Sequence, residues 1–194
     1  MSNNLSIEDV LQKLADGNKR YVSSAMLHPN QTAERRAEVS KGQNPFAVIV
    51  GCSDSRIPPE ILFDQGIGDL FVIRVAGNIA DEIALGSIEY AVEHLGTQLV
   101  MVLGHGKCGA VNATVQGGEI HGNIAGIIKT IAPAVEKVRG KPGDLADNAI
   151  RANVGLVVDT IMTSKPILAK LAGEGKIKVV GAYYNIESGL VEIL

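Results

Sequence analysis

Two short polar stretches contain the residue types that could do chemistry in this chain. The first is residues 52–56, with the sequence CSDSR, and the second is residues 105–108, with the sequence HGKC. Two thiolates and one neutral imidazole make a zinc site with an open fourth position and a formal charge near zero. Such a site keeps its Lewis acidity and brings a bound water towards a neutral pKa. Cys52, His105 and Cys108 are therefore candidate ligands of a catalytic zinc ion.

A carboxylate and a guanidinium accompany the first cysteine. Asp54 and Arg56 lie two and four residues after Cys52. As a surface ion pair they would contribute little stability. Alternatively, Arg56 holds Asp54 ionised beside the metal, where the carboxylate accepts a proton from zinc-bound hydroxide and aims the oxygen lone pair at a substrate. Asp54 could instead bind the zinc and close its fourth position, and the sequence does not choose between these states.

The two cysteines also allow interpretations without a metal. Cys52 and Cys108 are the only cysteines in the sequence, and they could form a disulfide or be inert buried thiols. Residues 1–5 lack a charged region and a long apolar run, so we expect no signal peptide and a cytoplasmic location, where disulfides are rare. The charged residues near Cys52 favour metal binding, because catalytic metal sites carry such groups around their ligands.

Each polar stretch follows a run of apolar residues. Residues 46–51 and 99–104 are continuously apolar, which is typical of parallel strands buried on both faces. If these strands are neighbours, both polar stretches emerge at the same carboxyl edge, where open α/β sheets bind ligands. Residues 109–115 then open a helix directly after Cys108, and its N-terminus favours the thiolate form of that cysteine.

Strands and helices alternate along most of the remaining chain. We predict further strands at residues 69–75, 176–184 and 190–194, the last antiparallel to its predecessor. We predict helices at residues 5–21, 32–40, 82–95, 123–139, 144–162 and 165–172, with a short one after Pro58. The pattern favours an α/β fold, with a mainly parallel central sheet flanked by helices, an antiparallel C-terminal edge strand and an N-terminal helical arm. We expect one domain over residues 1–194, made of the arm at 1–40 and a zinc core at 45–194.

The composition is that of an ordinary globular protein. Apolar residues make up 46% and charged residues 20% of the 194 residues, so the chain can bury a full core. The net charge is −3 and no basic stripe is present, which argues against a nucleic-acid partner. No stretch approaches about 18 consecutive apolar residues, so we expect no membrane span.

The two polar stretches, in this order and each after an apolar strand, resemble the motifs of the β-class carbonic anhydrases. The likeness extends from residues 17–21 (GNKRY) to the C-terminal strand, and it includes residues 69–74 (DLFVIR) and 86–92 (GSIEYAV). It implies reversible hydration of CO2 to bicarbonate and a proton, by attack of zinc-bound hydroxide. It also implies one Zn²⁺ per chain, with the following site residues: Cys52, His105 and Cys108 as ligands, and Asp54 and Arg56 as a catalytic dyad.

Within that family, the chain is similar to the subgroup that includes the plant enzymes. This subgroup has a glutamine nine residues before the first cysteine, here Gln43, which donates to the substrate oxygen. Its CO2 pocket has aromatic residues at the positions of Phe71 and Tyr90 and a small residue near Ala76. A second subgroup has a tryptophan before the first cysteine and an inhibitory bicarbonate site. This chain has no tryptophan, so we expect a water-ligated zinc without that inhibitory site.

The resemblance also bears on bicarbonate binding and assembly. The backbone N–H of Gly109 is a candidate donor to bicarbonate, and a glycine needed for close helix packing is an equal alternative. The N-terminal arm is expected to lie across a partner subunit in a homodimer or homotetramer. In that arrangement Gln43, Phe71 and Tyr90 face a neighbour's zinc, although Gln43 could also be only a surface residue that leads into the first strand.

Two other functions compete with CO2 hydration. A zinc hydrolase on the same scaffold would act on a linear CO2-like molecule such as CS2, but we see no insertion or C-terminal tail that would alter the entrance. A non-catalytic module would be a nucleotide binder or a structural zinc protein. No glycine-rich phosphate motif follows a strand, and closed structural zinc sites generally use four ligands rather than three.

Overall fold

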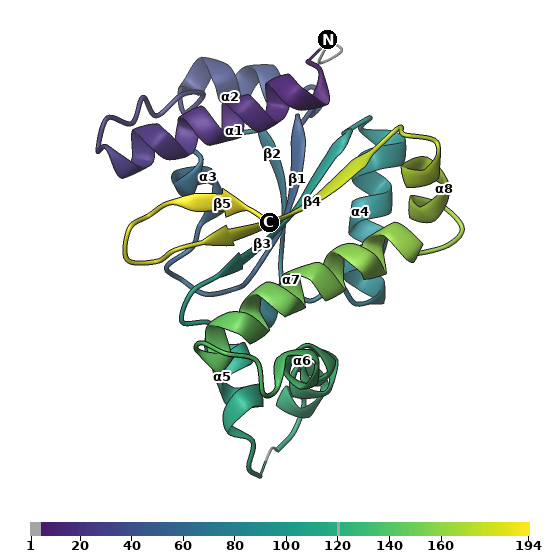
Figure 1. Ribbon diagram of the computed structural model, residues 1–194. Coiled ribbons are helices and arrows are strands. Elements are labelled where there is room, and N and C mark those ends of the chain that lie inside the picture. The colour runs from purple at the N-terminus through teal and green to yellow at the C-terminus, as the bar shows by residue number, and fades with distance from the viewer. Residues whose placement is uncertain (1–4, 120) are drawn as a thin grey trace.

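The centre of the fold is a sheet with the strand order β2-β1-β3-β4-β5 (Figure 1). It is seen in a computed structural model that describes residues 5–119 and 121–194. The strands are β1 (Ala47–Gly51), β2 (Leu70–Arg74), β3 (Leu99–His105), β4 (Lys178–Tyr184) and β5 (Val191–Ile193). All neighbouring pairs are parallel except β4 and β5, which are antiparallel. The predicted α/β fold with an antiparallel C-terminal edge strand is confirmed.

The order of the strands creates a switch point between β1 and β3. From β1 the chain first adds β2 on one side, and then crosses to add β3 on the other. Every residue of β1 and β3 is buried, as their continuous apolar sequences predict for strands covered on both faces. Since ligands bind at such switch points, outside the carboxyl ends of the strands, the fold marks the ends of β1 and β3 as the candidate site.

Helices cover both faces of this sheet (Figure 1). They are α1 (Ile7–Val22), α2 (Ala33–Val39), α3 (Pro59–Leu62), α4 (Glu82–His94), α5 (Gly109–Gln116), α6 (Ile124–Val138), α7 (Leu145–Thr163) and α8 (Leu168–Gly173), with a 3₁₀ turn η1 (Ala76–Asn78). One core cluster joins one face to α1, α3, α5 and α6, and the other joins the opposite face to α4, α7 and α8. Ala149 and Ile150 of α7 also belong to the first cluster. Among the described residues, no helix is long and apolar enough to cross a bilayer.

Three predicted elements begin two or three residues later than expected. The first helix, predicted from Leu5, begins at Ile7 after the N-cap Ser6. The helix predicted from Lys165 begins at Leu168, because Pro166 disfavours a helical conformation in the residue before it. The strand predicted from Lys176 begins at Lys178. The N–H groups of Lys176 and Ile177 instead donate to the Leu171 carbonyl and close the end of α8.

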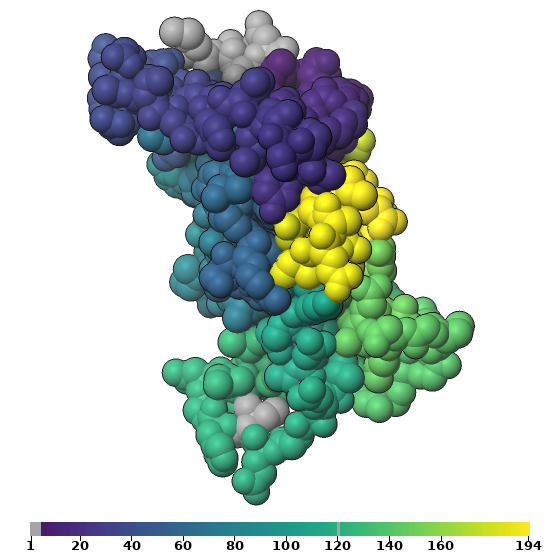
Figure 2. All heavy atoms as spheres, turned by 90° about the vertical axis from the view of Figure 1, so that its left-hand side faces the viewer, coloured from purple at the N-terminus to yellow at the C-terminus, as the bar shows by residue number. Residues whose placement is uncertain are grey.

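The first helix packs on its own sheet. Val10 and Leu14 are buried in the same core cluster as Phe46. Asn18 donates to the Gly189 carbonyl at 2.9 Å and accepts from the Val191 N–H at 2.9 Å. These bonds tie α1 to the C-terminal hairpin, and Figure 2 shows the yellow C-terminal residues directly against the purple N-terminal helix.

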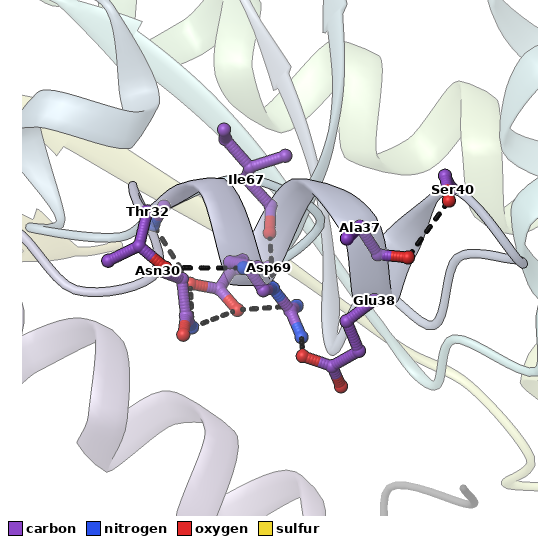
Figure 3. Close-up of polar contacts among 9 residues, drawn as sticks. Asn30, Thr32, Ala37, Glu38, Ser40, Ile67 and Asp69 are labelled. Carbon is purple, nitrogen blue, oxygen red and sulfur yellow. Dashed lines mark hydrogen bonds and ion pairs between the residues drawn. The ribbon is translucent and has the colours of Figure 1, made fainter.

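A buried aspartate fixes the segment that leads into β1 and β2. Asp69 accepts two hydrogen bonds of 2.9 Å from Asn30 Nδ2, and Figure 3 shows these two side chains pointing toward one another. Arg35 on α2 lies 3.5 Å from the same carboxylate and donates to the Ile67 carbonyl at 2.9 Å. The contacts hold α2 against the amino edge of the sheet, the edge opposite the switch point.

Candidate metal centre

Three buried side chains converge at the switch point. Cys52 directly follows β1, His105 is the last residue of β3, and Cys108 is the N-cap of α5. Their ligand atoms all lie within 4.8 Å of one another, and the three residues are buried. Both cysteines are free thiols, so the disulfide alternative is not adopted. The predicted convergence of the two polar stretches is confirmed.

The imidazole of His105 is held in the tautomer that suits a metal ligand. Its Nδ1 lies 2.9 Å from the Gly106 carbonyl oxygen, which can only accept, so Nδ1 carries the proton. The other nitrogen, Nε2, is buried and has no hydrogen-bond partner among the described residues. An unsatisfied buried acceptor costs free energy, and a metal ion bound at this nitrogen would remove the cost. Two thiols and a free imidazole nitrogen are the donor set that zinc prefers.

The two thiols differ in acidity. Contact with the Cys108 side chain, and with His105 and the Gly77 N–H at 3.2 Å, lowers the pKa of Cys52 to about 4 and outweighs the opposing effect of burial. The same contact and burial raise the pKa of Cys108, so the pair without a metal holds a proton between its two sulfurs. A metal that binds both sulfurs must displace the remaining proton.

Asp54 and Arg56 form a two-point ion pair beside the cluster. Arg56 Nε and Nη2 lie 2.9 Å and 2.7 Å from the two carboxylate oxygens. This guanidinium holds the pKa of Asp54 well below its usual range, so the carboxylate is ionised as predicted. Asp54 Oδ2 lies 4.0 Å from His105 Nε2, which places the pair at the cluster rather than on a remote surface. Arg56 also donates to the Lys107 carbonyl at 3.2 Å and so joins the two polar stretches.

Two residues that support the cluster were not singled out from the sequence. Arg74, at the end of β2, donates to the carbonyls of Cys52 at 2.9 Å and of Asp54 at 2.5 Å. Gly77 donates its N–H to the Cys52 sulfur. Two features of the sequence could have pointed to them: an arginine at the carboxyl end of a predicted strand, and a glycine in the turn that follows that strand.

The predicted substrate residues divide between the two edges of the sheet. Ala76 in η1 and Gly109 at the start of α5 lie at the carboxyl edge with the cluster. Gln43 is exposed before β1, at the amino edge, and does not join the cluster of its own chain. Phe71 lies near the start of β2, and its ring centroid is 6.3 Å from that of Tyr90 on α4.

The packing explanation for Gly109 is not supported. A Cβ built on this residue would meet no other atom within 4 Å. No neighbouring helix of the described chain therefore requires a glycine here.

A buried Cys2His cluster at the switch point of a parallel sheet is the candidate metal site of an α/β protein. The carbonic anhydrase family matches residues 47–191 of the chain. The carbonic anhydrase of Mycolicibacterium smegmatis is 41% identical over 184 residues, which cover 93% of this chain and 89% of that protein. Carbonic anhydrase 2 of Mycobacterium tuberculosis is 39% identical over 180 residues, which cover 91% of this chain and 87% of that protein. The chain therefore belongs to the carbonic anhydrase family.

Solved structures of β-carbonic anhydrases share the fold. The β-carbonic anhydrase CcaA has a TM-score of 0.75 and 25% identity, with 95% of this chain and 94% of that chain covered. The Coccomyxa enzyme in complex with acetazolamide has a TM-score of 0.73 and 27% identity, with 96% of this chain and 82% of that chain covered. A tetrameric enzyme of Sordaria macrospora, with a TM-score of 0.77 and 23% identity over 96% of this chain and 97% of that chain, supports the fold alone.

Proposed function

We propose that this protein is a zinc-dependent carbonic anhydrase that converts CO2 and water reversibly to bicarbonate and a proton. The observation that carries the proposal is the buried meeting of two free thiols with the unpartnered Nε2 of His105, beside an ionised Asp54. Zinc accepts this donor set, and three protein ligands leave a fourth position for water. Cys52, His105 and Cys108 are the proposed ligands of one Zn²⁺ per chain.

The dyad is proposed to orient the nucleophile. Zinc, when bound, supplies a Lewis acid that makes a water molecule nucleophilic near neutral pH. Arg56 engages both carboxylate oxygens of Asp54, which supports a state in which Asp54 is turned to Arg56 rather than bound to the metal. In that state Asp54 Oδ2 accepts the hydrogen of the nucleophile and directs its lone pair toward CO2.

The start of α5 is the proposed site for the bicarbonate oxygens. The first N–H groups of a helix have no partner within the helix and attract anions. Gly109 is the first residue of α5 and is exposed, so its N–H is accessible one residue after Cys108. Ala76 adds a small apolar side chain at the same edge, as the CO2 pocket requires.

We also propose a homodimer or homotetramer in which one chain completes another's site. Gln43 lies at the amino edge, so any contact with substrate would be made in a neighbour's site. Ile83 and Tyr90 on α4 are exposed to 78% and 48%, and an exposed apolar surface of this kind favours a second copy as the partner. A cytoplasmic location is proposed because both cysteines must stay reduced to bind zinc.

Metal reconstitution tests the function. Metal-free protein should show no CO2 hydration, and activity should rise with added zinc and level off at one equivalent per chain. CS2 consumption is measured in parallel as the control reaction. Zinc binding without CO2 hydration, or CS2 turnover in its place, would contradict the proposal.

A further inference from the structure

A backbone N–H from the turn after β2 donates to the Cys52 sulfur. The Gly77 N–H lies 3.2 Å from it, and Gly77 has the left-handed φ of 74°. A Cβ at this residue would lie 2.6 Å from Ile131 Cδ1, and the left-handed φ would strain any other residue, so glycine suits this position. A donor to a ligating thiolate fixes its direction and tunes how strongly it holds a metal.

The carbonyl group of Gly77 is bound by an asparagine on α7. Asn153 Nδ2 donates to the Gly77 carbonyl at 2.8 Å. Asn153 is only 1% exposed, and its neighbours Ile150 and Val154 belong to the apolar core. Gly77 is therefore held at its carbonyl by Asn153 while its N–H is directed to Cys52.

An asparagine at this buried position lowers the stability of the fold. Its Oδ1 is buried and has no hydrogen-bond partner in the part of the chain that the structure describes. An unpaired buried acceptor costs free energy that an aliphatic side chain would avoid. Among the described residues, the Asn153 side chain makes one hydrogen bond, from Nδ2 to the Gly77 carbonyl, and this bond explains why a polar residue stands here.

We propose that Asn153 is a positioning residue of the metal centre. It orients the Gly77 backbone so that the Gly77 N–H stays on the Cys52 sulfur, and it thereby strengthens zinc binding. The proposal rests on the assignment of Cys52 as a zinc ligand. A merely structural role, as a tie between α7 and η1, would leave the metal's properties unchanged.

Zinc affinity and the spectrum of the cobalt-substituted protein test the proposal. Asn153→Leu removes the donor at similar volume, and Asn153→Ala removes it without any risk of overpacking. Val157→Ala is the matched control, because it truncates a buried side chain on the same helix in the core cluster that contains neither Cys52 nor Cys108. We expect each Asn153 variant to weaken zinc binding about 10- to 100-fold in a chelator competition, and to shift the thiolate-to-cobalt charge-transfer band. The Val157→Ala variant should change neither.

Unchanged zinc affinity and an unchanged cobalt band in a folded Asn153 variant would overturn the proposal. A measurement on the unmutated protein guards against variants that fail to fold. In the protein loaded with ¹¹³Cd, magnetisation should pass between the Gly77 amide proton and the metal through the N–H···S bond, and its absence would also overturn the proposal. A cobalt protein without any thiolate band would contradict the ligand assignment instead, so the two failures are distinguishable.

Discussion

The three side chains of the cluster are fixed by different contacts. His105 is fixed by the bond from Nδ1 to the Gly106 carbonyl, and Cys52 by the Gly77 N–H. Cys108 is fixed by its place at the start of α5. The backbone of three segments, the loop after β1, the turn η1 and the turn before α5, therefore positions these side chains.

Loss of one sulfur should abolish the site. Cys108→Ser replaces the thiol with a hydroxyl of similar shape, which is a poor zinc ligand, so we expect zinc and CO2 hydration to be lost together. Zinc content is measured by elemental analysis and activity by stopped flow. A variant that keeps both zinc and full activity would show that Cys108 is not a ligand.

Removal of the guanidinium should separate zinc binding from activity. In Arg56→Ala, Asp54 loses its orientation or turns to the metal, so we expect most zinc to remain and kcat/KM to fall about 100-fold. The control is Arg139→Ala, because Arg139 makes a similar two-point pair with Glu136 on the surface of α6. Equal activity in the two variants would reduce the Asp54–Arg56 pair to a surface ion pair.

The dyad and the cluster could be predicted at the residue scale because side-chain type and spacing carry their chemistry. The contribution of Arg74 could not be predicted. Arg74 donates to the carbonyls of Cys52 and Asp54, and every residue has a carbonyl, so the sequence does not show which ones accept. The same holds for Gly77, whose donor is its own N–H. That the helix N-terminus favours the thiolate form of Cys108 stays a prediction, because the two sulfurs lie close enough to share a proton.

At the scale of elements, the buried strands made the site predictable. The continuous apolar runs of β1 and β3 indicated parallel strands, and their pairing side by side brings the two polar stretches together. The position of Gln43 relative to the cluster was harder to predict from the sequence, since it depends on which edge of the sheet each segment reaches. The late start of α8 followed from Pro166, which the periodicity of apolar residues alone does not weigh.

The buried carboxylate of Asp64 anchors the first half of the loop between α1 and α2. Asp64 accepts from Arg20 Nε at 2.6 Å and from the N–H groups of Leu27 and His28 at 3.0 Å each. Asp64→Asn should lower the free energy of unfolding by roughly 1–3 kcal/mol, since bonds to a charged acceptor are lost. Urea unfolding measures the change. Asp16→Asn, which breaks an exposed pair with Lys19, is the control and should stay within about 0.5 kcal/mol of wild type.

The contribution of Asp64 should depend on pH. Burial would raise the pKa of Asp64, but the Leu27 N–H, Arg20 and the His28 N–H outweigh it and lower the pKa. The unfolded chain therefore takes up the proton first, so the stabilisation is complete above about pH 4 and is lost as the pH falls through the lower folded value. The stability difference between wild type and Asp64→Asn should shrink between about pH 7 and pH 3, and a constant difference would contradict the assigned charge.

At the scale of the whole molecule, Gln43 and the zinc cluster lie at opposite edges of the sheet. This separation allows a test of whether one subunit supplies Gln43 to the site of another. If Gln43 serves a neighbour's site, a subunit with Gln43→Ala still offers an intact zinc cluster to a partner that supplies Gln43. Mixed oligomers of Gln43→Ala and Cys108→Ser subunits should therefore recover activity above the average of the two separate variants. No recovery in verified mixed oligomers would place Gln43 outside the site or in the site of its own chain.

The most direct test of the proposed activity is stopped-flow CO2 hydration by protein of measured zinc content, from about pH 6.5 to 9. Asp54 stays ionised across this range because Arg56 depresses its pKa, so it adds no step to the profile. We predict zinc near one equivalent per chain and activity that rises with pH through a single ionisation, that of the nucleophile. Full zinc content with negligible hydration at every pH would contradict the proposed function.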